Sequence, residues 1–149
     1  MYRTSAIQAP DSAAGVVVVH CADPRYQPHF QNFLRHQLGI PHYALLAVPG
    51  GAHCLTLAEA PLESGGGDWS WMKFLVNLTR PRRVILIGHD DCRWYLDSCS
   101  DANAANLREK VIADLRRVRS TIGERFPGPR VELYFAKQNP DGTAIFETA

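Results

Sequence analysis

Short runs of apolar residues alternate along the chain with segments in which apolar residues recur every three or four positions. Four runs rich in β-branched and aromatic residues predict β-strands at residues 16–19, 43–48, 84–87 and 131–135. The first three are continuous hydrophobic runs, which is typical of strands that are buried on both faces. A shorter run at residues 144–146 predicts one further strand near the end of the chain.

Three segments between the predicted strands show helical periodicity. Residues 28–38, 68–78 and 103–126 are expected to form helices, and the last of these has the clearest pattern. In it, apolar residues fall on one face with charged residues opposite: Leu107, Val111, Leu115, Val118 and Ile122. Glycine or proline follows each segment and predicts where the helix ends.

Apolar strands that alternate with helices predict an α/β fold: a single domain with a mostly parallel central sheet flanked by helices. We expect residues 15–149 to form this domain, and residues 1–14, which are mostly small and polar, to be a loosely packed N-terminal leader. In such sheets ligands bind beyond the carboxyl ends of the strands, so candidate site residues are sought there.

Composition and charge narrow the function classes. The 149 residues are 46% hydrophobic and 21% charged, which is typical of a globular protein. A formal net charge of +1 gives no general attraction to nucleic acids or membranes, so neither is an expected partner. Without an apolar run long enough for a signal peptide or a membrane span, the sequence predicts a cytoplasmic protein. The four cysteines are then expected to be thiols or metal ligands.

Three potential metal ligands follow the ends of two predicted strands. Cys21 comes directly after the first strand, and His89 and Cys92 come directly after the strand at residues 84–87. Adjacent parallel strands would bring these side chains together, and thiolate and imidazole are suitable ligands for Zn²⁺. Three protein ligands leave a fourth tetrahedral position open, as in catalytic zinc sites. The sequence therefore predicts one zinc ion bound by these three residues.

Two motifs that contain these ligands resemble those of the β-class carbonic anhydrases. That family carries Cys-x-Asp-x-Arg after its first strand and His-x-x-Cys after a later strand. Here the first motif reads CADPR at residues 21–25, and the second reads HDDC at residues 89–92. The resemblance extends over most of the chain, from about residue 16 to residue 135, but only the two motifs are specific.

The resemblance implies an activity and a role for each motif residue. The protein would be a zinc lyase that hydrates CO₂ reversibly to bicarbonate by means of zinc-bound hydroxide. Cys21, His89 and Cys92 would hold the zinc ion. Asp23 would accept a hydrogen bond from the zinc-bound water, and Arg25 would keep Asp23 ionised and correctly oriented.

Two stretches depart from the family pattern. Where the family usually has an Arg-Asn-Ala-Gly type of turn, this chain has VPGGAH at residues 48–53. Where the family prefers small residues after His-x-x-Cys, this chain has Arg93, Trp94 and Tyr95. Two other functions therefore stay open: a different zinc hydrolase on the same scaffold, and a non-catalytic zinc-binding protein.

The remaining candidate residues lie outside the motifs. His53 follows the second predicted strand and is either a proton shuttle at the same crevice or an exposed loop histidine. Cys54 and Cys99 have no ligand-like spacing and are expected to be ordinary thiols. The apolar segment at residues 69–78 predicts a surface that is buried against a second copy, in a homodimer or a larger homo-oligomer.

Overall fold

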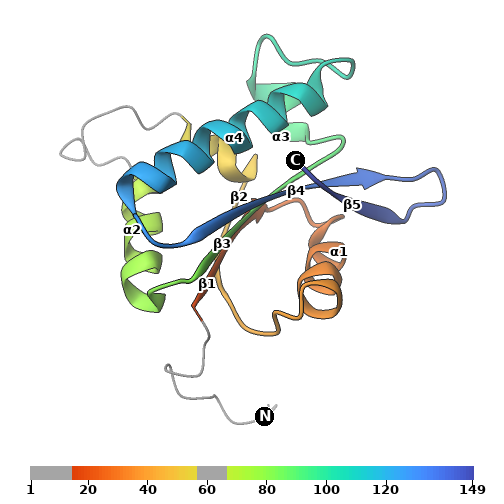
Figure 1. Cartoon of the computed structure of the whole chain (residues 1–149). Coiled ribbons are helices and arrows are strands. Elements are labelled where there is room, and N and C mark those ends of the chain that lie inside the picture. Colours follow the sequence, from red (N-terminus) through yellow and green to blue (C-terminus); the bar gives the residue numbers. More distant parts are fainter. Residues whose placement is uncertain (1–14, 57–66) are drawn as a thin grey trace, which may run out of the picture.

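The computed structural model describes residues 15–56 and 67–149, and its centre is a five-stranded sheet with the order β2-β1-β3-β4-β5. The strands are β1 (Val16–Cys21), β2 (Ala44–Val48), β3 (Arg83–His89), β4 (Arg130–Gln138) and β5 (Ala144–Thr148). The first four strands run parallel, whereas β5 pairs antiparallel with β4. The predicted α/β fold with a mostly parallel sheet is thereby confirmed (Figure 1). The predicted leader at residues 1–14 lies outside the described residues.

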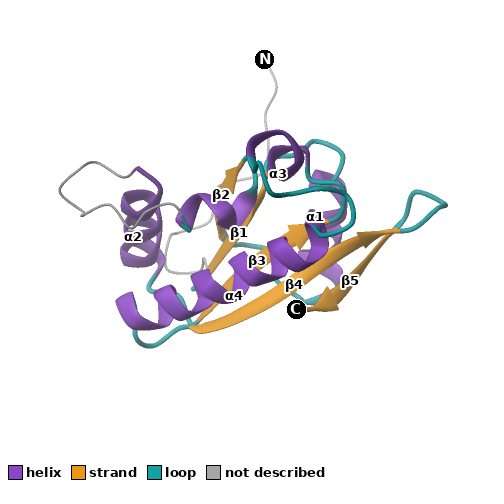
Figure 2. Ribbon diagram, turned by 90° about the horizontal axis from the view of Figure 1, so that it is seen from above, coloured by secondary structure: helices purple, strands orange, loops and turns teal. Residues whose placement is uncertain are grey.

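Helices cover both faces of this sheet (Figures 1 and 2). They are α1 (Gln27–Asn32) with its π-helical continuation η2 (Phe33–Gln37), the 3-10 helix η3 (Gly51–Leu55), α2 (Gly67–Thr79), α3 (Arg93–Ser98) and α4 (Leu107–Arg125). The three predicted helices are present, and the short α3 and η3 are additional. No helix in the described part of the chain is both long and apolar enough to cross a membrane.

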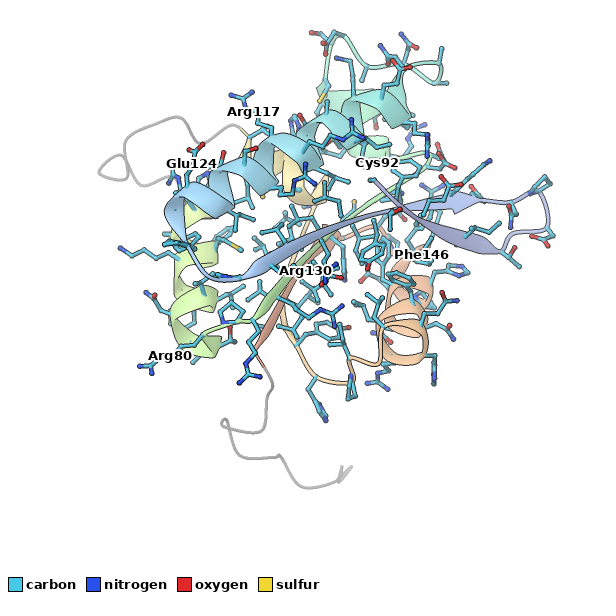
Figure 3. All side chains as sticks on the ribbon, in the orientation of Figure 1. Arg80, Cys92, Arg117, Glu124, Arg130 and Phe146 are labelled. Atoms are coloured by element: carbon cyan, nitrogen blue, oxygen red, sulfur yellow. The ribbon has the colours of Figure 1, made fainter. Side chains whose placement is uncertain are left out.

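Strand β1 supplies side chains to two separate hydrophobic cores. Val17 and Val19 pack into the core beneath α2 and α4, whereas Val16 and Val18 face the core beneath α1 and η2. All six residues of β1 are buried, as the continuous apolar run predicts. Strand β5 closes the second core, because its Phe146, labelled in Figure 3, stacks on Phe33 with ring centroids 4.0 Å apart.

Strand β2 is less buried than its sequence predicts. In the run at residues 43–48 only Leu46 is buried, and Leu45 is 43% exposed. The strand lies at the edge of the sheet, where it has a single neighbouring strand. The prediction of a second fully buried run was therefore wrong, because hydrophobicity does not specify the order of strands in a sheet.

Helix α4 lies close against the sheet at one glycine. All five residues of its predicted apolar stripe are buried. At Gly88 of β3, an added methyl group would lie only 2.3 Å from Cγ1 of Val111, on the facing side of α4. The absence of a side chain at position 88 thus sets how closely α4 can approach the strand that ends at His89.

Gly88→Ala is expected to lower the free energy of unfolding by about 1–3 kcal/mol, because the β-branched Val111 has little rotamer freedom in a helix. Gly123→Ala is the matched control, since position 123 lies in α4 with open space around an added methyl group. The control should stabilise the helix by about 0.5–1 kcal/mol. Urea unfolding of both variants measures the difference, and equal stabilities would contradict the close approach at Gly88.

Candidate metal centre

The three predicted ligands converge at the carboxyl ends of β1 and β3. These strands are parallel neighbours, with His20 of β1 opposite Ile87 of β3. Cys21 and His89 are therefore the last residues of two adjacent strands. After β3 the chain turns back through Asp91, whose φ of +51° lies in the left-handed region. This turn returns Cys92 to the other two residues, and the ligand atoms of all three lie within 4.8 Å of one another.

The donor atoms of this cluster fit a small tetrahedral metal ion. The Sγ atoms of Cys21 and Cys92 lie 3.8 Å apart. Two thiolates bound tetrahedrally at about 2.3 Å from a zinc ion would be separated by about 3.8 Å, so the pair already has the required spacing. All three residues are buried, with exposed fractions of 5% for Cys21, 2% for Cys92 and 1% for His89.

The imidazole of His89 is arranged as a ligand. Its Nδ1 lies 2.6 Å from the carbonyl oxygen of Asp90, which can only accept, so Nδ1 carries the proton. The other ring nitrogen, Nε2, is then a bare acceptor, and it is buried with no hydrogen-bond partner within the described residues. A buried acceptor without a partner is costly, and a metal ion in the cluster would satisfy it.

The two thiols differ in their affinity for a proton. The hydrogen bond between the two sulfurs lowers the pKa of Cys21 well below that of an ordinary thiol. The same hydrogen bond, together with burial, raises the pKa of Cys92. The hydrogen bond thus favours ionisation of Cys21 over ionisation of Cys92. A divalent cation would bind both sulfurs in their deprotonated form, because metal binding requires deprotonated sulfur.

Asp23 and Arg25 form an ion pair beside the cluster. The guanidinium of Arg25 donates to both carboxylate oxygens of Asp23, with Nη2 2.7 Å from Oδ2 and Nε 3.1 Å from Oδ1. The backbone N–H of Arg25 also donates to Oδ1 at 3.0 Å. These hydrogen bonds lower the pKa of Asp23, so its carboxylate is ionised at neutral pH. Asp23 is 10% exposed in its side chain, and Arg25 is 48% exposed.

Two residues that the motifs did not single out hold this segment. Asp91 binds Arg25 from the opposite side, with its Oδ2 2.6 Å from Nη1 and its carbonyl oxygen 3.0 Å from Nη2. Gln27 donates from Nε2 to the carbonyl oxygens of Cys21 and Asp23, at 2.9 Å each. The turn after β1 is thus fixed at both ends, which orients the carboxylate of Asp23.

The two stretches that depart from the family pattern, residues 48–53 and 93–95, contact each other in the structure. An added methyl group at Gly50 would lie 2.3 Å from Cδ1 of Trp94, so the indole packs directly on this glycine. At Gly51, which has a φ of +56°, a methyl group would lie 2.9 Å from the backbone nitrogen of Cys21. The glycine turn therefore lies against the end of β1. Arg93 extends along the surface, where it pairs with Asp97 at 3.2 Å.

His53 is not the exposed loop histidine that was one of its two predicted roles, and its role as a proton shuttle stays a prediction. Its side chain is only 15% exposed, so it is not an exposed loop histidine. Its Nδ1 lies 2.8 Å from Oδ2 of Asp114, and its Nε2 lies 3.7 Å from Sγ of Cys99. Both ring nitrogens are therefore engaged by residues outside the metal cluster. No local sequence pattern predicts the contact with Asp114, because this residue lies 61 positions further along the chain.

Comparisons with known proteins agree on the fold. The chain is similar to the β-carbonic anhydrase CcaA, with a TM-score of 0.54 and 13% identity over 90% of this chain and 79% of that one. It is also similar to tetrameric β-carbonic anhydrases from the filamentous ascomycete Sordaria macrospora, with a TM-score of 0.51 and 15% identity over 90% of this chain and 80% of theirs. No protein-family model and no curated protein matches the sequence. The chain thus has the β-carbonic anhydrase fold, with a Cys-His-Cys cluster at its strand ends.

Proposed function

We propose that the protein is a zinc-dependent lyase that catalyses the reversible hydration of CO₂. The observation that carries this proposal is the buried cluster of Cys21, His89 and Cys92, in which Nε2 of His89 has no partner among the described residues. Two thiols and an imidazole at tetrahedral spacing favour zinc over harder cations such as magnesium. The fold shared with β-carbonic anhydrases supports the same assignment.

Each residue of the site has a definable task in this reaction. Zinc, when bound, makes water acidic enough to act as a nucleophile near neutral pH. Asp23 would accept a hydrogen bond from the attacking water and so orient its lone pair towards the carbon of CO₂. Arg25 would keep Asp23 ionised and in place through their two-point ion pair. The near-complete burial of the ligands suits a small uncharged substrate better than a large polar one.

The alternative of a non-catalytic zinc protein makes a different prediction for the purified protein. Asp23 is bound by Arg25, and Trp94 packs on Gly50. The side chains of Asp23 and Trp94 therefore make contacts that do not require them to block the fourth ligand position. Stopped-flow measurement of CO₂ hydration between about pH 6 and 9, on protein with one zinc per chain, tests the proposal. Zinc-loaded protein without measurable hydration would eliminate the carbonic anhydrase function and leave a structural or sensory zinc site.

We also propose that the chain assembles as a homodimer or larger homo-oligomer through α2. Three large apolar residues of this helix are exposed: Trp71 by 51%, Phe74 by 63% and Leu78 by 63%. Their spacing of three and four places them on one helix face, and a contiguous apolar stripe of this size is typical of an interface. The tetrameric state of the Sordaria macrospora enzymes supports a second copy as the partner.

Phe74→Asp is expected to shift the protein to the monomer at tens of micromolar, because it places a carboxylate at the centre of this apolar stripe. Lys73→Asp, which introduces the same side chain on an exposed position of α2 outside the stripe, should leave the assembly intact. Light scattering gives the mass of each variant. A monomeric wild-type protein would contradict the proposed assembly.

The cytoplasmic location stays a prediction from the sequence.

A further inference from the structure

A second polar cluster lies on the side of the sheet covered by α4. It combines His53 of η3, Tyr95 of α3, Cys99 at the end of α3 and Asp114 of α4. Asp114 Oδ2 accepts hydrogen bonds from Nδ1 of His53 at 2.8 Å and from the hydroxyl of Tyr95 at 2.7 Å. Cys99 Sγ lies 3.7 Å from Nε2 of His53. Four side chains from three segments of the chain therefore form one connected network.

The protons of this network can be assigned from its donors and acceptors. An ionised carboxylate only accepts, so Nδ1 of His53 carries a proton and donates it to Asp114. Nε2 of His53 is then an acceptor, and it faces the thiol proton of Cys99. Burial raises the pKa of Tyr95, which keeps its hydroxyl protonated as the second donor to Asp114. The arrangement is a thiol, a base that can remove its proton, and a carboxylate that orients the base.

We propose that Cys99, His53 and Asp114 form a second, metal-independent site, in which Cys99 accepts acyl groups from small activated esters and thioesters. A nucleophile hydrogen-bonded to a base that a third group orients is the arrangement that such acyl transfer requires. The site is partly accessible to solvent, since Cys99 is half-buried and the side chains of His53 and Asp114 are 15% and 22% exposed.

The acyl transfer balances with these groups alone. His53 takes the thiol proton on Nε2 while Sγ of Cys99 forms a bond to the acyl carbon. The bond from that carbon to the leaving oxygen or sulfur then breaks, and the leaving group departs with the electron pair and receives the proton from His53. Water subsequently attacks the thioester carbon while His53 removes a proton from that water. The bond between this carbon and Sγ of Cys99 then breaks, His53 returns the proton to the sulfur, and the carboxylic acid is released with the Cys99 thiol restored.

The environment of Cys99 explains why the base is needed. Burial and the nearby carboxylates of Asp114 and Asp101 raise the pKa of the thiol. Cys99 therefore remains protonated when no electrophile is bound, and its reaction depends on proton removal by His53. A thiol that reacted as a free thiolate would not depend on His53. The two cases are distinguished by the effect of a substitution at position 53.

The experiment treats zinc-loaded protein with p-nitrophenyl acetate, stops the reaction with acid at early times before the thioester is hydrolysed, and follows acetylation of each cysteine by mass spectrometry. Cys99 should be acetylated faster than Cys54, the half-buried thiol next to His53 in sequence. His53→Gln should slow acetylation of Cys99 by about 10²-fold, the scale of losing a positioned base. Asp114→Asn should also slow it, because the carboxylate no longer orients the imidazole. Cys54→Ser should leave the rate at Cys99 unchanged.

An acetyl group on Cys99 distinguishes reaction at this site from hydrolysis of the ester at the metal centre, because hydrolysis at the metal centre would leave Cys99 unmodified. Cys99→Ser should lose the acetylation and keep its full zinc content. Within the wild-type protein, a rate at Cys99 no higher than that at Cys54 would overturn the proposal, even if the substituted proteins fail to fold. An unchanged rate in His53→Gln that retains the wild-type circular dichroism spectrum would overturn it as well.

Discussion

Cys21→Ser protein is expected to lose most of its zinc and, with it, all measurable CO₂ hydration. The serine hydroxyl is a far poorer zinc ligand than a thiolate, and the 3.8 Å pair that Cys21 forms with Cys92 would lose one of its two sulfurs. Changes to residues that only support a ligand weaken metal binding by about 10–100-fold, so loss of a direct ligand should exceed that range. Elemental analysis of dialysed protein measures the zinc content.

Cys54→Ser is the matched control for this variant, because it makes the same chemical change at a half-buried thiol outside the metal cluster. It should retain one zinc per chain and the wild-type rate of hydration. Circular dichroism establishes that both variants are folded, which matters because position 21 is buried at the end of a central strand. Full zinc occupancy in folded Cys21→Ser protein would remove Cys21 from the metal site.

The sequence predicts much of this fold because its strongest patterns are local. The apolar stripe of α4 runs from Leu107 to Ile122, and every residue of that stripe is buried in the structure. The run at residues 16–19 likewise predicts a strand covered on both faces. The cluster of Cys21, His89 and Cys92 could be predicted because each residue lies at or shortly after the carboxyl end of a strand, and parallel strands bring such positions to one edge.

The features that the sequence does not predict depend on contacts between distant segments. The edge position of β2 follows from the order of the strands, which no single segment specifies. The helices η3 and α3 have five and six residues, too few for a periodic pattern to be recognised. The contact between Trp94 and Gly50 depends on both of these segments at once. The hydrogen bonding of the motif residue Arg25 likewise depends on a distant segment, since its second partner, Asp91, lies 66 positions away.

Asp23→Asn protein is expected to keep its zinc but to hydrate CO₂ about 10²-fold more slowly, the scale of losing a positioned proton-handling group. Asparagine preserves the shape of the side chain and removes its charge. Its amide can present a donor where the attacking water requires an acceptor, and its ion pair with Arg25 is lost. Because Asp23 is not one of the three clustered ligands, the zinc content should not change.

Comparison with Asp91→Asn distinguishes two roles that Asp23 could have, namely holding Arg25 or orienting the attacking water. Both carboxylates bind Arg25, with Asp23 at 2.7 Å and Asp91 at 2.6 Å, but only Asp23 is proposed to touch the reacting water. If Asp23 served only to hold Arg25, the two variants should slow hydration to a similar extent. If Asp23 orients the water, Asp23→Asn should be far slower than Asp91→Asn, which retains the backbone contact of Asp91 to Arg25 at 3.0 Å. Stopped-flow hydration rates of both variants, each with its zinc content measured, decide between a positioning role and a catalytic role for Asp23.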